Sequence, residues 1–68
     1  MKRINVQSTN IKSIWYENWI LEVEFHHGWV YQYSWVSENE YLNLLNANSV
    51  GSYFSHHIKS NYSCVKVW

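Results

Sequence analysis

The feature that most constrains the fold of this chain is the strict alternation of side-chain type between Trp19 and Phe25. Trp19, Leu21, Val23 and Phe25 alternate with Ile20, Glu22 and Glu24. This period of two predicts a strand with one buried face and one wet face that carries carboxylates. Residues 26–28 read as a chain reversal in which Gly28 supplies a positive φ, and Trp29 to Val36 reads as the next strand. An antiparallel β-meander results.

Shorter segments extend this meander on both sides. Residues 2–8 read as a short strand and Ile11 to Tyr16 as another, with Glu17 and Asn18 as a two-residue turn before the alternating strand. Residues 63–68 read as a final short strand. The sequence therefore predicts a sheet of three to five strands.

Two short helices are expected after the meander. Ser37 and Glu40 have the spacing of a capping box, in which the serine hydroxyl accepts from the Glu40 N–H and the carboxylate reaches back. This box predicts an amphipathic helix at about residues 38–47. A second helix, capped by Ser49, extends to Lys59. The fold class is α+β, with an antiparallel β-meander packed by two short C-terminal helices.

Size and aromatic content together predict an association surface. The 68 residues form one domain, 1–68, whose small core gives little stability to spare. Such a core cannot enclose five Trp and six Tyr, so several rings must lie on a surface or at an interface. We expect a homo-oligomer formed through exposed aromatics.

Composition also excludes several classes of protein. No run approaches the roughly 18 consecutive apolar residues of a membrane span, and the N-terminus has no apolar signal segment. The one cysteine, Cys64, forms no internal disulfide and is expected to be a buried, small apolar residue, which favours a reducing, cytoplasmic setting. A net charge of zero argues against a long polyanion as the main partner.

Tyr31 and Tyr33 are the first candidate binding residues. They are two apart on one strand, so their rings point to the same side about 7 Å apart, a spacing at which planar groups stack. A three-residue turn at 26–28 places them on the core face with Leu21, whereas a two-residue turn at 27–28 places them beside Glu22. The alternative interpretation is that both tyrosines only pack in the core or on the sheet.

The start of the second helix is the other candidate. Ser49, Gly51, Ser52 and Tyr53 combine hydroxyls, a close backbone approach and helix-start N–H groups, which together favour a phosphate. His57 and Lys59 follow on the same helix and supply a polar ring and a cation. Simple helix capping in a tight connection is the alternative interpretation.

Catalytic and metal chemistry find little support. The four His form two adjacent pairs, and on a strand neighbouring side chains point to opposite faces, so we expect no metal site. Glu22 and Glu24 share a strand face, as ordinary solvated residues do. We therefore expect no catalytic residues, no cofactor and no enzyme activity.

The order of these segments resembles the KTSC domain, a small module that is also found at the C-terminus of some lysyl-tRNA synthetases. The residues that carry the resemblance are Ser8, Asn10, Ile11, the strand 21–25, Gly28, Tyr31, Tyr33, Leu44, Leu45, Ala47, Ser49, Gly51, Tyr53, Phe54, His57, Ile58, Lys59 and Tyr62. The resemblance implies an RNA-binding or nucleotide-binding role without enzyme activity. Where the family usually has Arg between the two tyrosines this chain has Gln32, so a cation for phosphate is missing there.

These observations predict a non-enzymatic binding module for a nucleotide-type ligand. The base would stack on Tyr or Trp, and the helix start would hold the phosphate. Charge favours a small nucleotide over RNA, because following many phosphates requires several cations. By functional analogy the chain could be a phage-type sponge that sequesters an immune signalling nucleotide and so counters host defence. The alternatives are single-stranded RNA binding and a protein–protein interaction module that uses its Trp residues.

Overall fold

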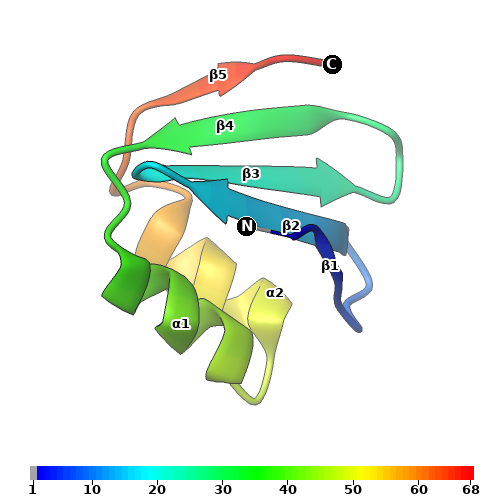
Figure 1. Cartoon of the computed structure of the whole chain (residues 1–68). Coiled ribbons are helices and arrows are strands. Elements are labelled where there is room, and N and C mark those ends of the chain that lie inside the picture. The colour runs from blue at the N-terminus through cyan, green and yellow to red at the C-terminus, as the bar shows by residue number, and fades with distance from the viewer. Residues whose placement is uncertain (1) are drawn as a thin grey trace.

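The computed structural model, which describes residues 2–68, has a five-stranded antiparallel sheet with a layer of helices on one face (Figure 1). The strands are β1 (Ile4–Asn5), β2 (Ile11–Glu17), β3 (Ile20–Phe25), β4 (Val30–Ser34) and β5 (Cys64–Lys66), and they lie in chain order across the sheet. The helical elements are α1 (Glu38–Asn46), α2 (Val50–Tyr53) and the π-helix η1 (Phe54–Ile58), which continues α2. The predicted α+β meander with two helices is confirmed.

The turn between β2 and β3 differs from its prediction by one residue. Glu17 pairs with Ile20, so the two-residue loop is Asn18 and Trp19 rather than Glu17 and Asn18. Both loop residues have positive φ, 52° and 70°, as a type I′ turn requires. Trp19 therefore leaves the strand face shared by Leu21 and Val23 and is about half exposed. The predicted place of Trp19 in the strand was wrong because the β2–β3 register makes it a turn residue.

The turn between β3 and β4 has three residues. The N–H of Phe25 donates to the carbonyl of Trp29 at 2.9 Å, and Gly28 has the expected positive φ of 103°. Leu21 consequently pairs with Tyr33 and Val23 with Tyr31. Of the two registers that the sequence allowed, this is the one that points both tyrosines toward the helices.

The helix caps follow the predicted pattern in part. The Ser37 hydroxyl accepts from the Glu40 N–H at 3.1 Å, and the Ser49 hydroxyl accepts from the Ser52 N–H at 3.2 Å. The Glu40 carboxylate does not complete the capping box. It accepts instead from the hydroxyls of Tyr53 and Tyr62. No helix among residues 2–68 has the length and apolar character that crossing a bilayer requires.

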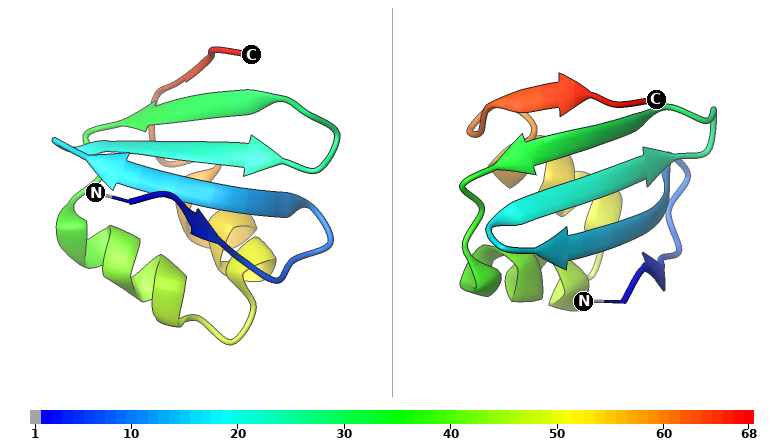
Figure 2. Two further views of the ribbon diagram at one scale, coloured as in Figure 1. Left: turned by 45° about the vertical axis from the view of Figure 1, so that its right-hand side comes forward. Right: turned by 45° about the horizontal axis from the view of Figure 1, so that its top comes forward.

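The core lies between the helices and the face of β2, β3 and β4 that they cover (Figure 2). Its buried apolar side chains are Ile11, Ile14, Tyr16, Leu21, Val23, Tyr33, Val36, Tyr41, Leu44, Val50, Phe54 and Ile58. Two predictions about the ends of the chain need correction, one on the length of the first strand and one on the burial of Cys64. β1 spans two residues instead of seven, and Cys64 is exposed because it lies on the edge strand β5. The expectation that surplus rings lie outside is confirmed by Trp19, Trp29, Trp35 and Trp68.

Candidate functional site: an aromatic cleft

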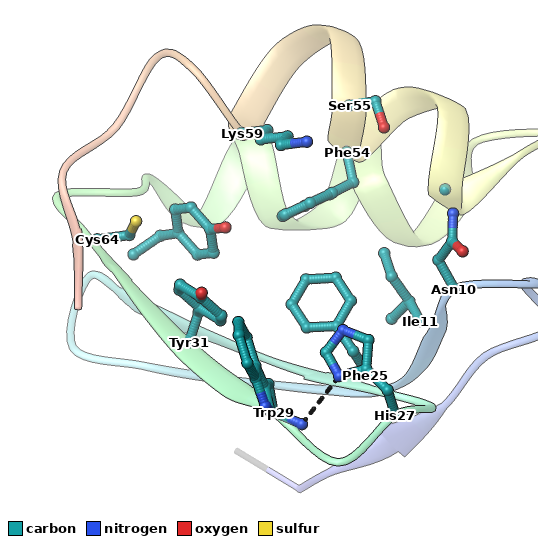
Figure 3. Close-up of a pocket in the computed structure, with 12 residues that line it drawn as sticks. Asn10, Ile11, Phe25, His27, Trp29, Tyr31, Phe54, Ser55, Lys59 and Cys64 are labelled. Atoms are coloured by element: carbon teal, nitrogen blue, oxygen red, sulfur yellow. Dashed lines mark hydrogen bonds between the residues drawn. The ribbon is translucent and has the colours of Figure 1, made fainter. Parts of the chain in front are cut away.

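A cleft of about 430 Å³ opens between the end of the sheet and the second helical segment (Figure 3). This volume is within the usual range of small-molecule sites. The sheet side carries an aromatic surface, and the helix side carries Gly51, Phe54, Ser55 and Lys59. The remaining lining residues are Asn10, Ile11, Phe25, His27, Trp29, Tyr31, Tyr33 and Cys64.

Three rings form a row along the sheet side. Trp29, Tyr31 and Tyr33 alternate along β4 and the residue before it, so all three point to one face. The ring centroids of Tyr31 and Tyr33 are 6.5 Å apart with planes 28° apart, and those of Trp29 and Tyr31 are 6.2 Å apart. Exposure rises along the row, from buried Tyr33 through half-buried Tyr31 to Trp29, which is 48% exposed. A planar ligand can therefore reach Trp29 and Tyr31 more readily than Tyr33.

The base of the cleft is rigid because its rings pack edge to face. Phe54 meets Phe25 at 5.8 Å and Tyr33 at 5.4 Å, both in edge arrangements that aromatic pairs favour. Burial raises the pKa of Tyr33 to about 12, and the neighbouring Cys64 adds to the shift. The Tyr33 hydroxyl therefore stays protonated at neutral pH.

Polar groups and cations line the rim. Lys59 enters from the helix side, and Lys66 of β5 holds its ammonium 3.8 Å from the centroid of the Trp29 ring. His27 stacks on Phe25, and its Nδ1 accepts from the Trp29 N–H at 3.3 Å. Among the lining residues, which all belong to the described part of the chain, there is no carboxylate. The cleft thus suits a planar group that carries a small negative charge.

The eight residues singled out from the sequence line three hollows, and one of these, of about 530 Å³, brings Gly51 together with Ser49 and Ser52. Tyr31, Tyr33, Gly51 and Lys59 line the aromatic cleft. The other four line a separate hollow of about 320 Å³ on the helix layer, namely Ser49, Ser52, Tyr53 and His57. A ligand stacked on the tyrosines is therefore not held by the predicted helix-start hydroxyls.

Internal contacts account for much of the helix start. The Ser49 hydroxyl and carbonyl accept from the N–H groups of Ser52 and Tyr53. Tyr53 stacks on His57 at 4.3 Å and donates its hydroxyl to Glu40, which raises the pKa of that hydroxyl. The backbone of Gly51 closely approaches Ser8 of the same chain, whose Oγ would lie 2.9 Å from a Cβ at position 51.

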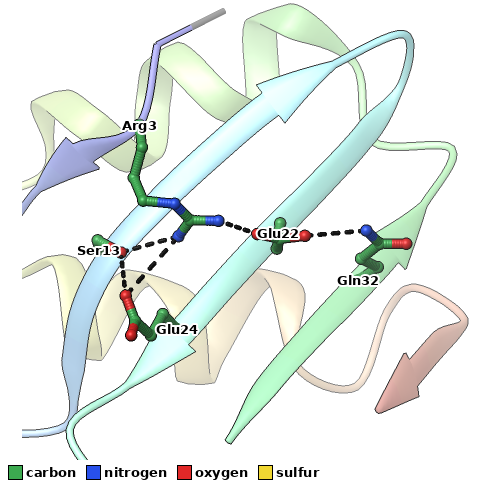
Figure 4. Close-up of polar contacts among 5 residues, drawn as sticks. All are labelled: Arg3, Ser13, Glu22, Glu24 and Gln32. Carbon is green, nitrogen blue, oxygen red and sulfur yellow. Dashed lines mark hydrogen bonds and ion pairs between the residues drawn. The ribbon is translucent and has the colours of Figure 1, made fainter. Parts of the chain in front are cut away.

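The opposite face of the sheet carries a charged network (Figure 4). Arg3 contacts Glu22 and donates to Ser13 at 2.8 Å, and Ser13 donates to Glu24 at 2.7 Å. Gln32 donates to Glu22 at 2.9 Å. The two carboxylates are therefore engaged as pairing partners. Position 32 faces away from the cleft, so a cation there would not reach a ligand bound among the rings.

Several cleft residues were not singled out from the sequence. Trp29 could have been found, because it shares the strand period of Tyr31 and Tyr33. Ser55 could also have been found, because it lies four residues from both Gly51 and Lys59, whereas Asn10 and Cys64 reach the cleft from separate elements. Among residues 2–68, no three His, Cys, Asp or Glu side chains cluster in a way that could hold a metal ion.

Comparison with known proteins gives a consistent assignment. The family model described as KTSC domain matches residues 7–62. An uncharacterized protein from Stutzerimonas stutzeri (strain A1501) is 39% identical over 64 residues, which cover 91% of this chain and 90% of that protein. The crystal structure of a KTSC domain protein from Yersinia pestis is 37% identical, covers 98% of this chain and 97% of its own, and superposes with a TM-score of 0.91.

Proposed function

This chain belongs to the KTSC domain family, and from that premise we propose that it is a non-enzymatic module that binds a small nucleotide-type ligand in the aromatic cleft. The observation that carries the proposal is the row of graded exposure from Tyr33 to Trp29 beside Lys59. Exposed rings in a row offer stacking to a base, and base–aromatic stacking contributes roughly 1–3 kcal/mol. Lys59 offers one phosphate a counter-charge.

The charge of the cleft favours a small ligand over a polymer. Lys59 lines the cleft and Lys66 lies over one of its rings, while the whole chain has a net charge of zero. Binding along RNA draws on many phosphate contacts, which these two lysines cannot supply. A ligand with one or two phosphates matches the two lysines. We therefore assign the phosphate to Lys59 and the Gly51 side of the cleft. The hollow lined by Ser49, Ser52, Tyr53 and His57 is not part of the proposed binding site.

Sequestration is the form of activity that this proposal favours. The described lining residues offer no carboxylate, and the one imidazole among them, His27, stacks on Phe25 and accepts from the Trp29 N–H through Nδ1, so this nitrogen is engaged within the fold. A module of this kind would hold a signalling nucleotide intact, as a phage sponge against host defence does. The single Cys64 accords with a reducing, cytoplasmic setting.

Titration calorimetry with nucleoside monophosphates and cyclic dinucleotides tests the proposal. We expect binding that Trp29→Ala and Lys59→Ala each weaken about tenfold, the loss of roughly 1.4 kcal/mol. Lys12→Ala is the matched control, because Lys12 is exposed and does not line the cleft. The bound nucleotide should be recovered unchanged after the protein is denatured.

Three outcomes would contradict the proposal. A chemically altered nucleotide would indicate an enzyme. Affinity for single-stranded RNA well above that for every nucleotide, with a steep dependence on salt, would indicate an RNA-binding domain. Equal affinities of the Lys59→Ala and Lys12→Ala variants would remove the cleft as the binding site.

A further inference from the structure

The outer edge of β5 has no strand partner among residues 2–68 (Figure 2). On its inner edge the segment hydrogen-bonds to β4, with the Ser63 carbonyl accepting from Ser34 and the Val67 N–H donating to Val30. Successive residues of an antiparallel strand direct their N–H and C=O groups to opposite edges. Cys64 and Lys66 therefore direct these groups outward.

This edge is only partly protected as a sheet border, because β5 has three residues and one charged side chain, Lys66. Natural edges are protected by charged side chains, proline, bulges or very short strands. β1, at the other border, has two residues, and Arg3, which directly precedes it, pairs with Glu22 on the sheet face. Apolar side chains are exposed on and just beyond β5: Val65 is 61% exposed, and Trp68, the second residue after the strand, is 80% exposed. Lys66 is exposed as well, and its ammonium lies over the Trp29 ring.

We infer that a second copy of this chain occupies this edge, with β5 pairing antiparallel to β5 around a two-fold axis that passes between the two Val65 residues. In this register Cys64 of each copy lies opposite Lys66 of the other. The outward N–H and C=O groups then form four hydrogen bonds, and the two sheets become one continuous sheet. This inference goes beyond the proposed function and does not depend on it.

Charge and area agree with this occupant. Across the two-fold axis Cys64 meets Lys66 and Ser63 meets Val67, so no like charges face each other. Val65, Val67 and Trp68 are 61%, 42% and 80% exposed, and a buried tryptophan alone contributes roughly 150–250 Å². Standard stable interfaces bury about 800 Å² per partner. A three-residue strand with these side chains makes a smaller contact, so we expect a dimer that dissociates on dilution.

The dimer also joins the two aromatic clefts. Cys64 lines the cleft, and in this register it has Lys66 of the second copy beside it. Each cleft then has a second cation near its wall. Only this consequence rests on the proposed function.

Sedimentation velocity over a wide concentration range tests the dimer without any ligand. Val65→Lys and Val65→Glu each place two like charges, one from each copy, opposite each other at the axis. Each variant should raise the dissociation constant at least about a hundredfold, because such juxtapositions cost several kcal/mol. An equimolar mixture of the two variants should dimerise again. Leu42→Lys is the matched control, since it adds the same charge at an exposed apolar residue of α1 and should leave dimerisation unchanged.

Cross-linking tests the register. Residues directly opposite in a non-hydrogen-bonded pair have Cα atoms about 4.5 Å apart, which a disulfide spans. Val65→Cys in a Cys64→Ser background should therefore form a disulfide dimer with oxidised glutathione, and faster than wild-type Cys64 does. A wild-type chain that stays monomeric at every concentration, a dimer that survives Val65→Lys, or a faster wild-type cross-link would each overturn the inference.

Discussion

Gln32 donates a hydrogen bond from Nε2 to Oε1 of Glu22 at 2.9 Å, on the sheet face opposite the aromatic cleft. Gln32 lies between Tyr31 and Tyr33 in sequence, yet strand alternation turns its side chain away from both rings. The missing arginine at this position, which the family resemblance associates with lost phosphate affinity, therefore concerns another surface.

Gln32→Arg should leave the nucleotide affinity of the cleft within about twofold of wild type. The guanidinium would pair with Glu22, in competition with Arg3, on the sheet face away from the cleft, where it does not reach the ligand. Calorimetric titration of the variant against the nucleotide with the highest wild-type affinity measures this. A tenfold gain in affinity would show that position 32 acts on the ligand.

Tyr31→Ala and Tyr33→Ala should separate binding from stability. Tyr33 is 4% exposed and packs on Phe54, so its truncation should cost about 3–5 kcal/mol of unfolding free energy. Tyr31 is half-buried, so Tyr31→Ala should cost less unfolding free energy while it weakens ligand binding. Urea unfolding of both variants, together with titration of Tyr31→Ala, checks the ranking. Equal losses of stability would contradict the assigned burial.

The sequence predicted the sheet better than it predicted the site, for identifiable reasons. The alternation from Leu21 to Phe25 and the positive φ of Gly28 are local properties, and they lead directly to the β3–β4 pairing. Trp19 was misplaced because nothing in its side chain marks it for a left-handed turn position. The long-range register of the sheet decided it.

The split of the predicted site follows from helical geometry. Gly51, Ser55 and Lys59 are spaced by four residues and share the helix face that lines the cleft. Ser49, Ser52 and His56 are spaced by three and four residues and line the hollow on the helix layer. Residues that are adjacent in sequence were grouped as one site, whereas the helical turns distribute them over different faces, and Gly51 meets Ser49 and Ser52 in a third hollow. The part played by Glu40, which accepts from Tyr53 and Tyr62, depends on packing that no local pattern records.

Gly51→Ala should destabilise the fold through Ser8. A Cβ at position 51 would lie 2.9 Å from Ser8 Oγ, which already accepts from the N–H groups of Asn10 and Ile11 at 3.2 Å. We expect a loss of about 1–2 kcal/mol, although alanine is intrinsically better than glycine in a helix by about 1 kcal/mol. In a Ser8→Ala background the same change should be neutral or stabilising. A double-mutant cycle by urea unfolding measures the coupling, and additive effects would rule out this contact as the cause.

Stability should fall at alkaline pH, and Tyr33 should account for much of the fall. Its pKa is raised from 10.0 to about 12 by burial, with a further contribution from Cys64. A folded-state pKa above the unfolded value means that the neutral hydroxyl stabilises the fold below pH 10 and that this contribution is lost as pH rises from 10 through about 12. Urea midpoints measured up to this range should decline less for Tyr33→Phe than for wild type. Burial raises the pKa of Tyr16 and Tyr41 too, so a smaller decline should remain in the variant, and an unchanged decline would show that Tyr33 is not its source.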